Sequence, residues 1–373
     1  MIPVQRPCVG QEELKLVSEV FESRWLGMGS VTRTFEDRLA SLLGVRHVVA
    51  VNTGTSALHL ALNALALKPG DEVIVPSLTF VATVQAILQA GATPVFCEVS
   101  PETLNMDLAD AFNRVTPRTK AFLPVHYGGL PCEMDGLLLF AREHDIRIVE
   151  DAAHAFGSSY KGRPIGGLGD LTCFSFDPIK NITCGEGGAV TTNDDELASR
   201  LVPARILGID NDTWSRYRNE RNWFYQVVEP GFRYHLSNIN AAIGLAQLDR
   251  LDAFKSRKRA IVRQYDEAFG AVGGLALIRH DLDEEFPFFY IVRVLDGRRD
   301  SLMTHLKGRG VGSGVHYIPN HIQPLFSKYA MPLPVTEQVF EEIVTLPLYV
   351  EMTDDGVALV VSAVRHFFAA APV

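Results

Sequence analysis

Apolar residues recur at two different spacings along this chain, and the change of spacing predicts where helices and strands lie. Residues 10–43 hold two stretches with helical spacing, EELKLVSEVFES and VTRTFEDRLASLLG, joined by RWLGMGS. From His47 to Asp151, short apolar runs typical of strands alternate with longer amphipathic stretches. We therefore expect repeated β-α crossovers, which produce a mainly parallel sheet with helices on both faces.

The same pattern continues to the end of the chain with longer helices and fewer strands. Residues 193–208 have helical spacing, whereas 209–236 are polar and aromatic without a clear period and are predicted to form a long loop. Residues 238–269 predict one long helix. Beyond it, 286–296 and 311–317 are predicted as strands, and 299–310 and 352–368 as helices.

These elements predict an α/β protein with two domains. We expect a large domain over 1–245, with the mainly parallel sheet, and a smaller C-terminal α+β domain over 246–373, entered by the long helix. A chain of 373 residues, 47% of them hydrophobic, is long enough to bury a core in each.

Composition excludes several classes of partner. The net charge is −9 and no long basic run occurs, so nucleic acid is not an expected partner. The five cysteines form no C-x-x-C pair, which argues against a disulfide framework and a zinc site and favours a reducing cytoplasm. No signal peptide is recognisable, and no apolar run approaches the roughly 18–20 residues that span a bilayer. We expect a cytoplasmic protein that binds neither a metal nor a membrane.

The stretch 148–192 has the clearest chemical character. Its first strand ends at two carboxylates, Glu150 and Asp151. Lys161 lies in a polar turn and should be solvated, whereas Lys180 lies between an apolar strand and a glycine cluster and should be held inside. A buried carboxylate and a buried amine at neighbouring strand ends indicate a site, because a fold does not require them.

Three further features lie at predicted strand ends, where parallel sheets bind ligands. Gly54, Thr55 and Ser56 start a helix after a strand, either as an anion site or as a simple helix cap. Phe80 follows the next strand and is either a ring that stacks on a planar ligand or a core aromatic. Ser175 precedes Lys180 by five residues, and its hydroxyl would reach the same anion.

Asp151 is followed by Ala-Ala-His. A buried aspartate needs a cationic or hydrogen-bonding partner, and a protonated ring nitrogen would supply one. His154 either orients that aspartate and contacts the ring or is a satisfied core histidine. An anion site, a stacking ring, a carboxylate for a ring nitrogen and an amine nucleophile are together what pyridoxal 5′-phosphate requires.

Longer motifs add a family resemblance that covers nearly the whole chain. The series EDAAHAFGSSYKGRPIGGLGDLTCFSF, KNITCGEGGAVTT, NTGTSALHLAL, GDEVIVPSLTFVAT and GVHYIPNHIQPLF resembles the DegT/DnrJ/StrS-type aminotransferases. These are fold type I pyridoxal phosphate enzymes that act on nucleotide-linked keto-sugars. The resemblance implies a homodimer with shared active sites, a keto-deoxysugar substrate, and glutamate or glutamine as amino donor.

Carried over by position, the resemblance also implies individual roles. Lys180 would carry the cofactor and move protons, and Asp151 would pair with the pyridine nitrogen. The remaining cofactor contacts would come from Gly54, Thr55, Ser56, Phe80, His154, Ser175 and Arg233. Tyr317 and His321 are the expected substrate contacts. Trp25, in the link between the first two helices, either fills a hydrophobic space between them or contacts the substrate. The segment GFRYH (231–235) has Arg233 where the family usually has asparagine and His235 where it usually has arginine, so a changed phosphate contact is expected there.

Three alternatives remain beside this reading. A keto-cyclitol as acceptor is compatible with every motif. A pyridoxamine-dependent sugar dehydratase is disfavoured because such relatives replace the lysine with histidine, and Lys180 is present. A non-catalytic, cofactor-binding regulator is disfavoured because no helix-turn-helix or basic surface run is visible.

Overall fold

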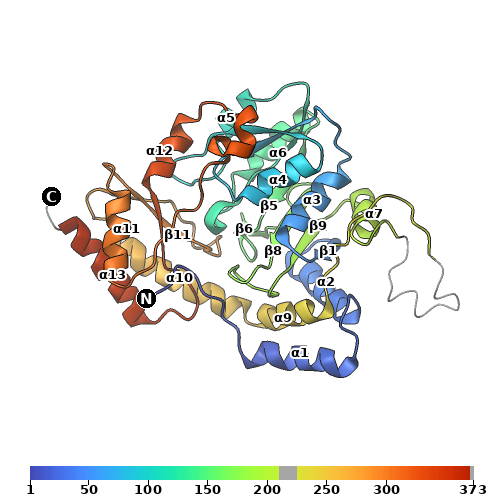
Figure 1. Ribbon diagram of the computed structural model, residues 1–373, viewed down its shortest axis with the longest axis horizontal. Coiled ribbons are helices and arrows are strands. Elements are labelled where there is room, and N and C mark those ends of the chain that lie inside the picture. Colours follow the sequence, from blue (N-terminus) through green and yellow to red (C-terminus); the bar gives the residue numbers. More distant parts are fainter. Residues whose placement is uncertain (210–224, 370–373) are drawn as a thin grey trace.

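The computed structural model describes residues 1–209 and 225–369, and a seven-stranded sheet lies at its centre (Figure 1). β9 runs antiparallel to both of its neighbours, and the other paired strands are parallel to one another. The mainly parallel sheet is therefore confirmed. In spatial order the strands are β1 (His47–Val51), β9 (Gly188–Thr192), β8 (Leu171–Ser175), β5 (Arg147–Asp151), β4 (Thr119–Phe122), β2 (Glu72–Pro76) and β3 (Thr93–Cys97).

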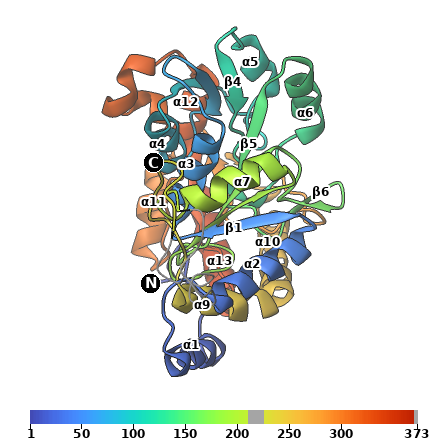
Figure 2. The ribbon, with the colours of Figure 1, turned by 90° about the vertical axis from the view of Figure 1, so that its right-hand side faces the viewer.

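Helices cover both faces of this sheet, which is why its central strands are continuous apolar runs. One face packs on α3, α4 and α7, and the opposite face packs on α2 and α9 (Figure 2). The helices of this part are α1 (Gln11–Ser23), α2 (Ser30–Leu43), α3 (Gly54–Ala64), α4 (Val81–Gln89), α5 (Leu108–Asn113), α6 (Met134–Glu143), α7 (Asp195–Ala204) and α9 (Asn238–Asp249). The short strands β6 (Ser159–Tyr160) and β7 (Arg163–Pro164) form a hairpin, and η1 (Tyr127–Gly129) is a 3-10 turn.

A second, antiparallel sheet forms in the C-terminal part, with the strand order β10–β11–β12. Its core joins the long helix α10 to α11 and α13 around Tyr265 and Tyr290, both fully buried. The elements are α10 (Leu251–Phe269), β10 (Leu275–Leu277), β11 (Tyr290–Val294), α11 (Arg299–Gly308), η2 (Asn320–Ile322), η3 (Pro324–Tyr329), α12 (Pro334–Glu342), β12 (Ile343–Leu346) and α13 (Asp354–Ala369). The smaller α+β unit is thus present, while its limits, 246–373, stay a prediction.

Two predicted elements differ from the structure. The single helix over 238–269 is broken at Arg250, whose backbone (φ −107°, ψ 0°) ends α9, and whose guanidinium donates to Glu13 Oε1 on α1 at 3.1 Å. The predicted strand over 311–317 is wrong, because only single bridges form there, Ile2 with Val311 and Gly314 with Thr345. Glycines at 310, 312 and 314 interrupt that segment.

Most of the predicted loop over 209–236 lies outside the described residues. Its described C-terminal end packs on the large unit. Arg233 forms an isolated β-bridge with Ile206, and His235 forms one with Val51. Among the described helices, none is long and apolar enough to cross a membrane.

Candidate active site

A cavity of about 380 Å³ opens at the carboxyl edge of the large sheet. The turns after β1, β2, β5 and β8 meet there, because those four strands run in the same direction. The C-terminal unit contributes His316 and Tyr317, from the segment between α11 and η2. The lining includes Gly54 and these polar and aromatic residues: Thr53, Thr55, Thr79, Phe80, Thr83, Asp151, His154, Ser175, Asp177, Lys180, Glu186, His316 and Tyr317.

The turn at the start of α3 lies directly against the end of β8. A Cβ on Gly54 would stand only 2.6 Å from Ser175 Cβ, so this contact requires glycine. Thr55 lines the cavity at the first helical turn, whose N–H groups have no intrahelical acceptor. Gly54, Thr55 and Ser175 together offer backbone donors and two hydroxyls, which suits an anion.

Ser56 faces the turn itself and not the cavity. Its backbone N–H donates to Thr53 Oγ1 at 3.0 Å, and its hydroxyl donates to Asn52 Oδ1 at 2.7 Å. The helix-cap interpretation therefore describes Ser56, whereas Gly54 and Thr55 remain available to a ligand.

Asp151, the last residue of β5, is buried at the cavity wall with a side chain that is 4% exposed. Thr83 donates to its Oδ2 at 2.7 Å and the Ala153 N–H donates to its Oδ1 at 3.1 Å. Burial raises the pKa of this carboxyl group in spite of those two donors and the nearby Lys180. A charged Asp151 is thus only partly compensated, which is the condition for binding a cation.

Lys180 enters the same cavity from the turn between β8 and β9. Its ammonium nitrogen lies 4.6 Å from the centroid of the Phe288 ring. Burial lowers the pKa of Lys180 to about 8, opposed by the charges of Asp151 and Asp177. Near neutral pH this amine can therefore shed its proton far more readily than an ordinary lysine. Lys161, by contrast, is exposed and pairs with Asp135.

His154 is buried beneath the cavity and stacks on Phe288, with ring centroids 4.5 Å apart. Its Nε2 lies 3.1 Å from the Tyr317 hydroxyl, and its Nδ1 has no hydrogen-bond partner among the described residues. Burial, together with Lys180 and His316, holds the pKa of His154 well below its usual value, so the ring is neutral. A satisfied core histidine would not leave Nδ1 unpartnered.

Phe80 caps the N-terminus of α4 and is 52% exposed at the cavity. Its ring centroid lies 5.5 Å from that of Tyr317. Such exposure excludes the core-aromatic interpretation and leaves the ring face available to a planar ligand.

Besides Ser56, three predicted residues lie away from this cavity. Trp25 and Arg233 line a separate hollow of about 230 Å³ with His235. His321 is buried between Ser77 Oγ, 2.7 Å from its Nδ1, and Glu337 Oε1, 3.2 Å from its Nε2. Within one chain, then, the structure does not bring them to Lys180, and their roles stay predictions.

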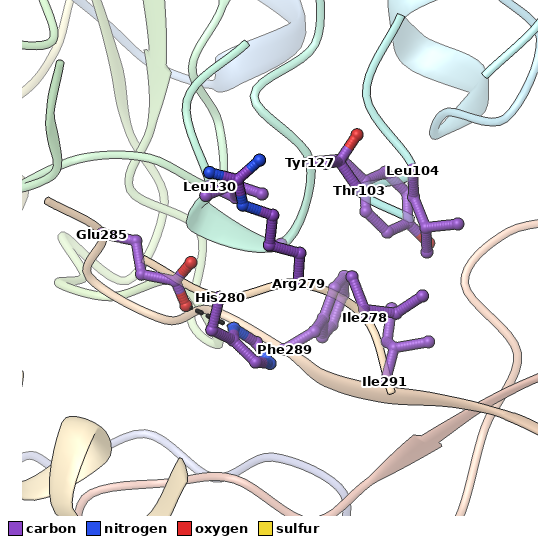
Figure 3. Close-up of a pocket in the computed structure, with 11 residues that line it drawn as sticks. Thr103, Leu104, Tyr127, Leu130, Ile278, Arg279, His280, Glu285, Phe289 and Ile291 are labelled. Carbon is purple, nitrogen blue, oxygen red and sulfur yellow. Dashed lines mark hydrogen bonds and ion pairs between the residues drawn. The ribbon is translucent and has the colours of Figure 1, made fainter. Parts of the chain in front are cut away.

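A small pocket between η1 and the segment before β11 is also distinct from the site (Figure 3). The ion pair between His280 Nδ1 and Glu285 Oε1, 2.6 Å apart, lies at its wall. None of the residues predicted from the sequence lines it.

Sequence reasoning missed several residues around the cavity. Thr83 follows Phe80 by one helical turn, and that spacing would have placed it on the same face. Asp177 and Glu186 flank Lys180 in segments whose lysine and glycines gave the clearer signal. His316 and Phe288 come from the C-terminal unit, whose packing on the large unit no local pattern reveals.

Comparison with known proteins decides the family. Residues 7–365 match the model of the DegT/DnrJ/EryC1/StrS aminotransferase family. The chain belongs to this family. It is 40% identical to the spore coat polysaccharide biosynthesis protein SpsC of Bacillus subtilis over 374 aligned positions, covering 98% of this chain and 96% of SpsC.

Solved structures give the same answer. The PMP form of the putative sugar aminotransferase Spr1654 from Streptococcus pneumoniae matches with a TM-score of 0.93 and 30% identity, over 99% of each chain. Helicobacter pylori PseC, an aminotransferase involved in the biosynthesis of pseudoaminic acid, matches with a TM-score of 0.92 and 27% identity, again over 99% of each. This member of the family is therefore a transaminase of the sugar aminotransferase type, with the fold type I architecture and pyridoxal 5′-phosphate as its cofactor.

Proposed function

We propose that this aminotransferase converts a nucleotide-linked keto-deoxysugar into the corresponding amino sugar, with glutamate or glutamine as the amino donor. The observation that carries the proposal is that Asp151 and Lys180 share one cavity with the turn at Gly54. The relatives named for polysaccharide and pseudoaminic acid biosynthesis support a sugar as the acceptor.

The residues of the cavity fit the cofactor. Gly54, Thr55 and Ser175 would hold the phosphate, and Phe80 would lie against the ring. The partly compensated carboxylate of Asp151 would keep a proton on the pyridine nitrogen. His154 lines the same cavity, and its Nδ1 has no hydrogen-bond partner among the described residues. When bound, the cofactor supplies an electron sink for the carbanion that forms when the donor loses its α-proton.

Lys180 would do the proton transfer of the reaction. Its lowered pKa makes the neutral form of Nζ far more populated than in an ordinary lysine, and that form would take a proton from the donor α-carbon and return it in the second half-reaction. Asp177 and Glu186 line the same cavity, and their carboxylates are suited to accept hydrogen bonds from sugar hydroxyls.

We further infer a homodimer with shared sites, in the cytoplasm. Arg233 lies outside the cavity of its own chain, so a phosphate contact from this residue requires a partner subunit. The five cysteines are free thiols, which suits a reducing compartment.

Mixing two inactive variants tests the shared site. Lys180→Ala and Arg233→Ala homodimers, unfolded, mixed and refolded together, would regain about a quarter of wild-type activity if each site takes Lys180 from one subunit and Arg233 from the other. No recovery, with light scattering showing that mixed dimers form, would place both residues in one subunit's site.

The substrate is tested with a panel of nucleotide-linked 3-keto and 4-keto deoxysugars, each with glutamate and with glutamine. Mass spectrometry and NMR would identify the aminated carbon and its configuration. Free keto-sugars and a keto-cyclitol serve as controls. Amination of the cyclitol, with none of the nucleotide-linked sugars accepted, would overturn the proposed acceptor.

A further inference from the structure

Two buried hydroxyl groups connect the turn that carries Phe80 to the carboxylate of Asp151. Thr79 directly precedes Phe80 and is 2% exposed, and Thr83, in the first turn of α4, is 1% exposed. Their Oγ1 atoms are 2.9 Å apart, and Thr83 Oγ1 lies 2.7 Å from Asp151 Oδ2. Thr79, Thr83 and Asp151 therefore form one hydrogen-bond relay, and all three line the cavity.

The direction of the relay follows from the carboxylate at its end. A hydroxyl group has one proton to donate, and an ionised carboxylate can only accept. Because Thr83 donates its proton to Asp151, its contact with Thr79 requires the Thr79 hydroxyl to donate. A donor that itself accepts a hydrogen bond is a stronger donor, so Thr79 strengthens the bond from Thr83 to Asp151.

This is not the usual use of a threonine in a helix. Such a hydroxyl commonly donates to a carbonyl oxygen three or four residues earlier. The carbonyl oxygen four residues before Thr83 is that of Thr79, and it accepts Nδ2 of Asn320 at 2.8 Å. Thr83 donates instead to a different element, β5, and packing alone does not call for its hydroxyl, since valine has the same shape.

The C-terminal unit holds the start of the relay in place. Asn320, which is 1% exposed, donates from its backbone N–H to the Ser77 carbonyl oxygen at 2.8 Å. Its Nδ2 donates to the carbonyl oxygens of Ser77 and Thr79 at 3.1 and 2.8 Å. The Ser77 hydroxyl lies 2.7 Å from His321 Nδ1. These contacts fix the turn that holds Thr79, and with it the position of the relay against Asp151.

We propose that Thr79 and Thr83 are positioning residues for Asp151, which hold its carboxylate charged and turned toward the ring nitrogen of the cofactor. The proposal rests on the pairing of Asp151 with that nitrogen, inferred above. Without the Thr83 hydroxyl, the Ala153 N–H would be the one remaining donor to the Asp151 side chain among the described residues. Burial raises the pKa of Asp151, and the hydrogen bond from Thr83 opposes that rise.

The test compares two ligands that differ only at the ring nitrogen. Pyridoxamine 5′-phosphate binds without bonding to Lys180, and its 1-deaza analogue has a C–H group in place of the ring nitrogen, so the analogue cannot pair with Asp151. Isothermal titration calorimetry on the full-length protein, freed of cofactor, gives both dissociation constants. An effect transmitted through Asp151 changes the affinity for the first ligand alone, whereas a packing defect changes both.

Thr83→Val removes the hydroxyl and keeps the shape of the side chain. It should weaken the binding of pyridoxamine 5′-phosphate about tenfold, because a hydrogen bond to a charged group is lost, and leave the analogue within about twofold of wild type. Thr79→Val should show the same pattern at about threefold, since it acts through Thr83. Thr83→Ser, which restores the hydroxyl, should recover the wild-type affinity for both ligands.

Thr172→Val is the matched control. Thr172 donates to Glu150 Oε1 at 2.7 Å, and Glu150 faces away from the cavity, so the same substitution there should leave both dissociation constants as in wild type. Thermal unfolding verifies that each variant is folded. Thr79→Val keeps the hydrogen bond from Thr83 to Asp151 and carries the test if Thr83→Val does not fold.

Two outcomes would overturn the inference. Equal losses of affinity for the two ligands in Thr83→Val would assign the hydroxyl to packing or to a direct ligand contact. Unchanged affinity for both would show that Asp151 keeps its position without the relay. Failure of the proposed pairing of Asp151 is separate, because the wild type would then bind the two ligands equally well, whatever the variants show.

Discussion

Two adjacent carboxylates on β5, Glu150 and Asp151, lie on opposite faces of the same sheet. Their pKa values are shifted in opposite directions. Glu150 is fully buried and accepts hydrogen bonds from His126 Nε2 (2.9 Å), Thr172 Oγ1 (2.7 Å) and the Gly169 N–H (2.8 Å). Burial alone would raise the pKa of Glu150, but these donors outweigh it and lower the pKa.

Asp151 has fewer donors and keeps a raised pKa, because burial dominates at the cavity wall. On the Glu150 side the network is closed, since even His126 Nδ1 accepts the Cys132 N–H at 3.0 Å. On the Asp151 side, the Nδ1 of His154 is left without a partner among the described residues. Closed hydrogen bonding thus marks a structural carboxylate, and incomplete hydrogen bonding marks one prepared for a ligand.

The largest expected effect is at the amine that faces Asp151. Replacing Lys180 with Ala should lower turnover by roughly 10⁴-fold or more, because the amine that bonds to the cofactor and moves the proton is lost. Activity assays and the absorbance of lysine-bound cofactor measure it. Lys161→Ala, at the exposed lysine, is the control and should behave as wild type; comparable activity in both variants would refute the assignment.

Asp151→Asn tests the ligand-facing carboxylate itself. Without its charge the cofactor ring nitrogen loses its proton, and kcat should fall by about 10²- to 10⁴-fold. The unfolding free energy of the cofactor-free variant should be unchanged or higher, because a poorly compensated buried charge is removed. Steady-state kinetics and denaturant unfolding measure the two effects. A large loss of stability with little loss of kcat would show that Asp151, and not only Glu150, is a structural carboxylate.

Glu150→Gln should show the opposite pattern. Loss of the charge weakens three hydrogen bonds in a closed network and should lower the unfolding free energy by about 1–3 kcal/mol. The kcat per folded molecule should stay near that of wild type, because Glu150 faces away from the cavity. Chemical denaturation followed by fluorescence, with kinetics on the folded fraction, tests this expectation.

The smallest effect is a difference in pH dependence in the cofactor-free protein. The lowered pKa of Glu150 means that its contribution is present above about pH 4.5, its unfolded value, and is lost as the pH falls through the folded pKa. The raised pKa of Asp151 works in reverse, since its destabilising contribution is relieved as the pH falls through that value. Acid titrations of stability should therefore be shallower in Glu150→Gln and steeper in Asp151→Asn than in wild type.

The difference between these neighbours also shows what sequence reasoning reaches. Apolar runs predict the strand ends, and parallel strands bring those ends together, so the sequence alone predicts that Gly54, Phe80, Asp151 and Lys180 share one site, and all four line the same cavity. The sequence does not distinguish Glu150 from Asp151. Which carboxylate has its full set of hydrogen bonds depends on His126 and Thr172, which come from other strands and turns.

Contacts that depend on how the C-terminal unit packs were out of reach. Lys258 belongs to a run of charged residues on a helix, and only the position of α10 against the Lys180 turn distinguishes it from its solvated neighbours. The break at Arg250 is set by its contact with Glu13 on a distant helix and not by a proline or glycine. Similarly, His321 is occupied by Ser77 and Glu337, partners that its own motif does not contain.

The contact between Gly54 and Ser175 has a consequence for engineering this enzyme. Because two rigid elements touch there with no room for a side chain, the spacing between anion site and lysine is set by the scaffold. Trp25 lies in a different hollow, so it can be varied without altering that spacing. Substrate preference should thus be exchangeable among relatives by grafting the segment around Trp25, while the reaction centre is inherited unchanged.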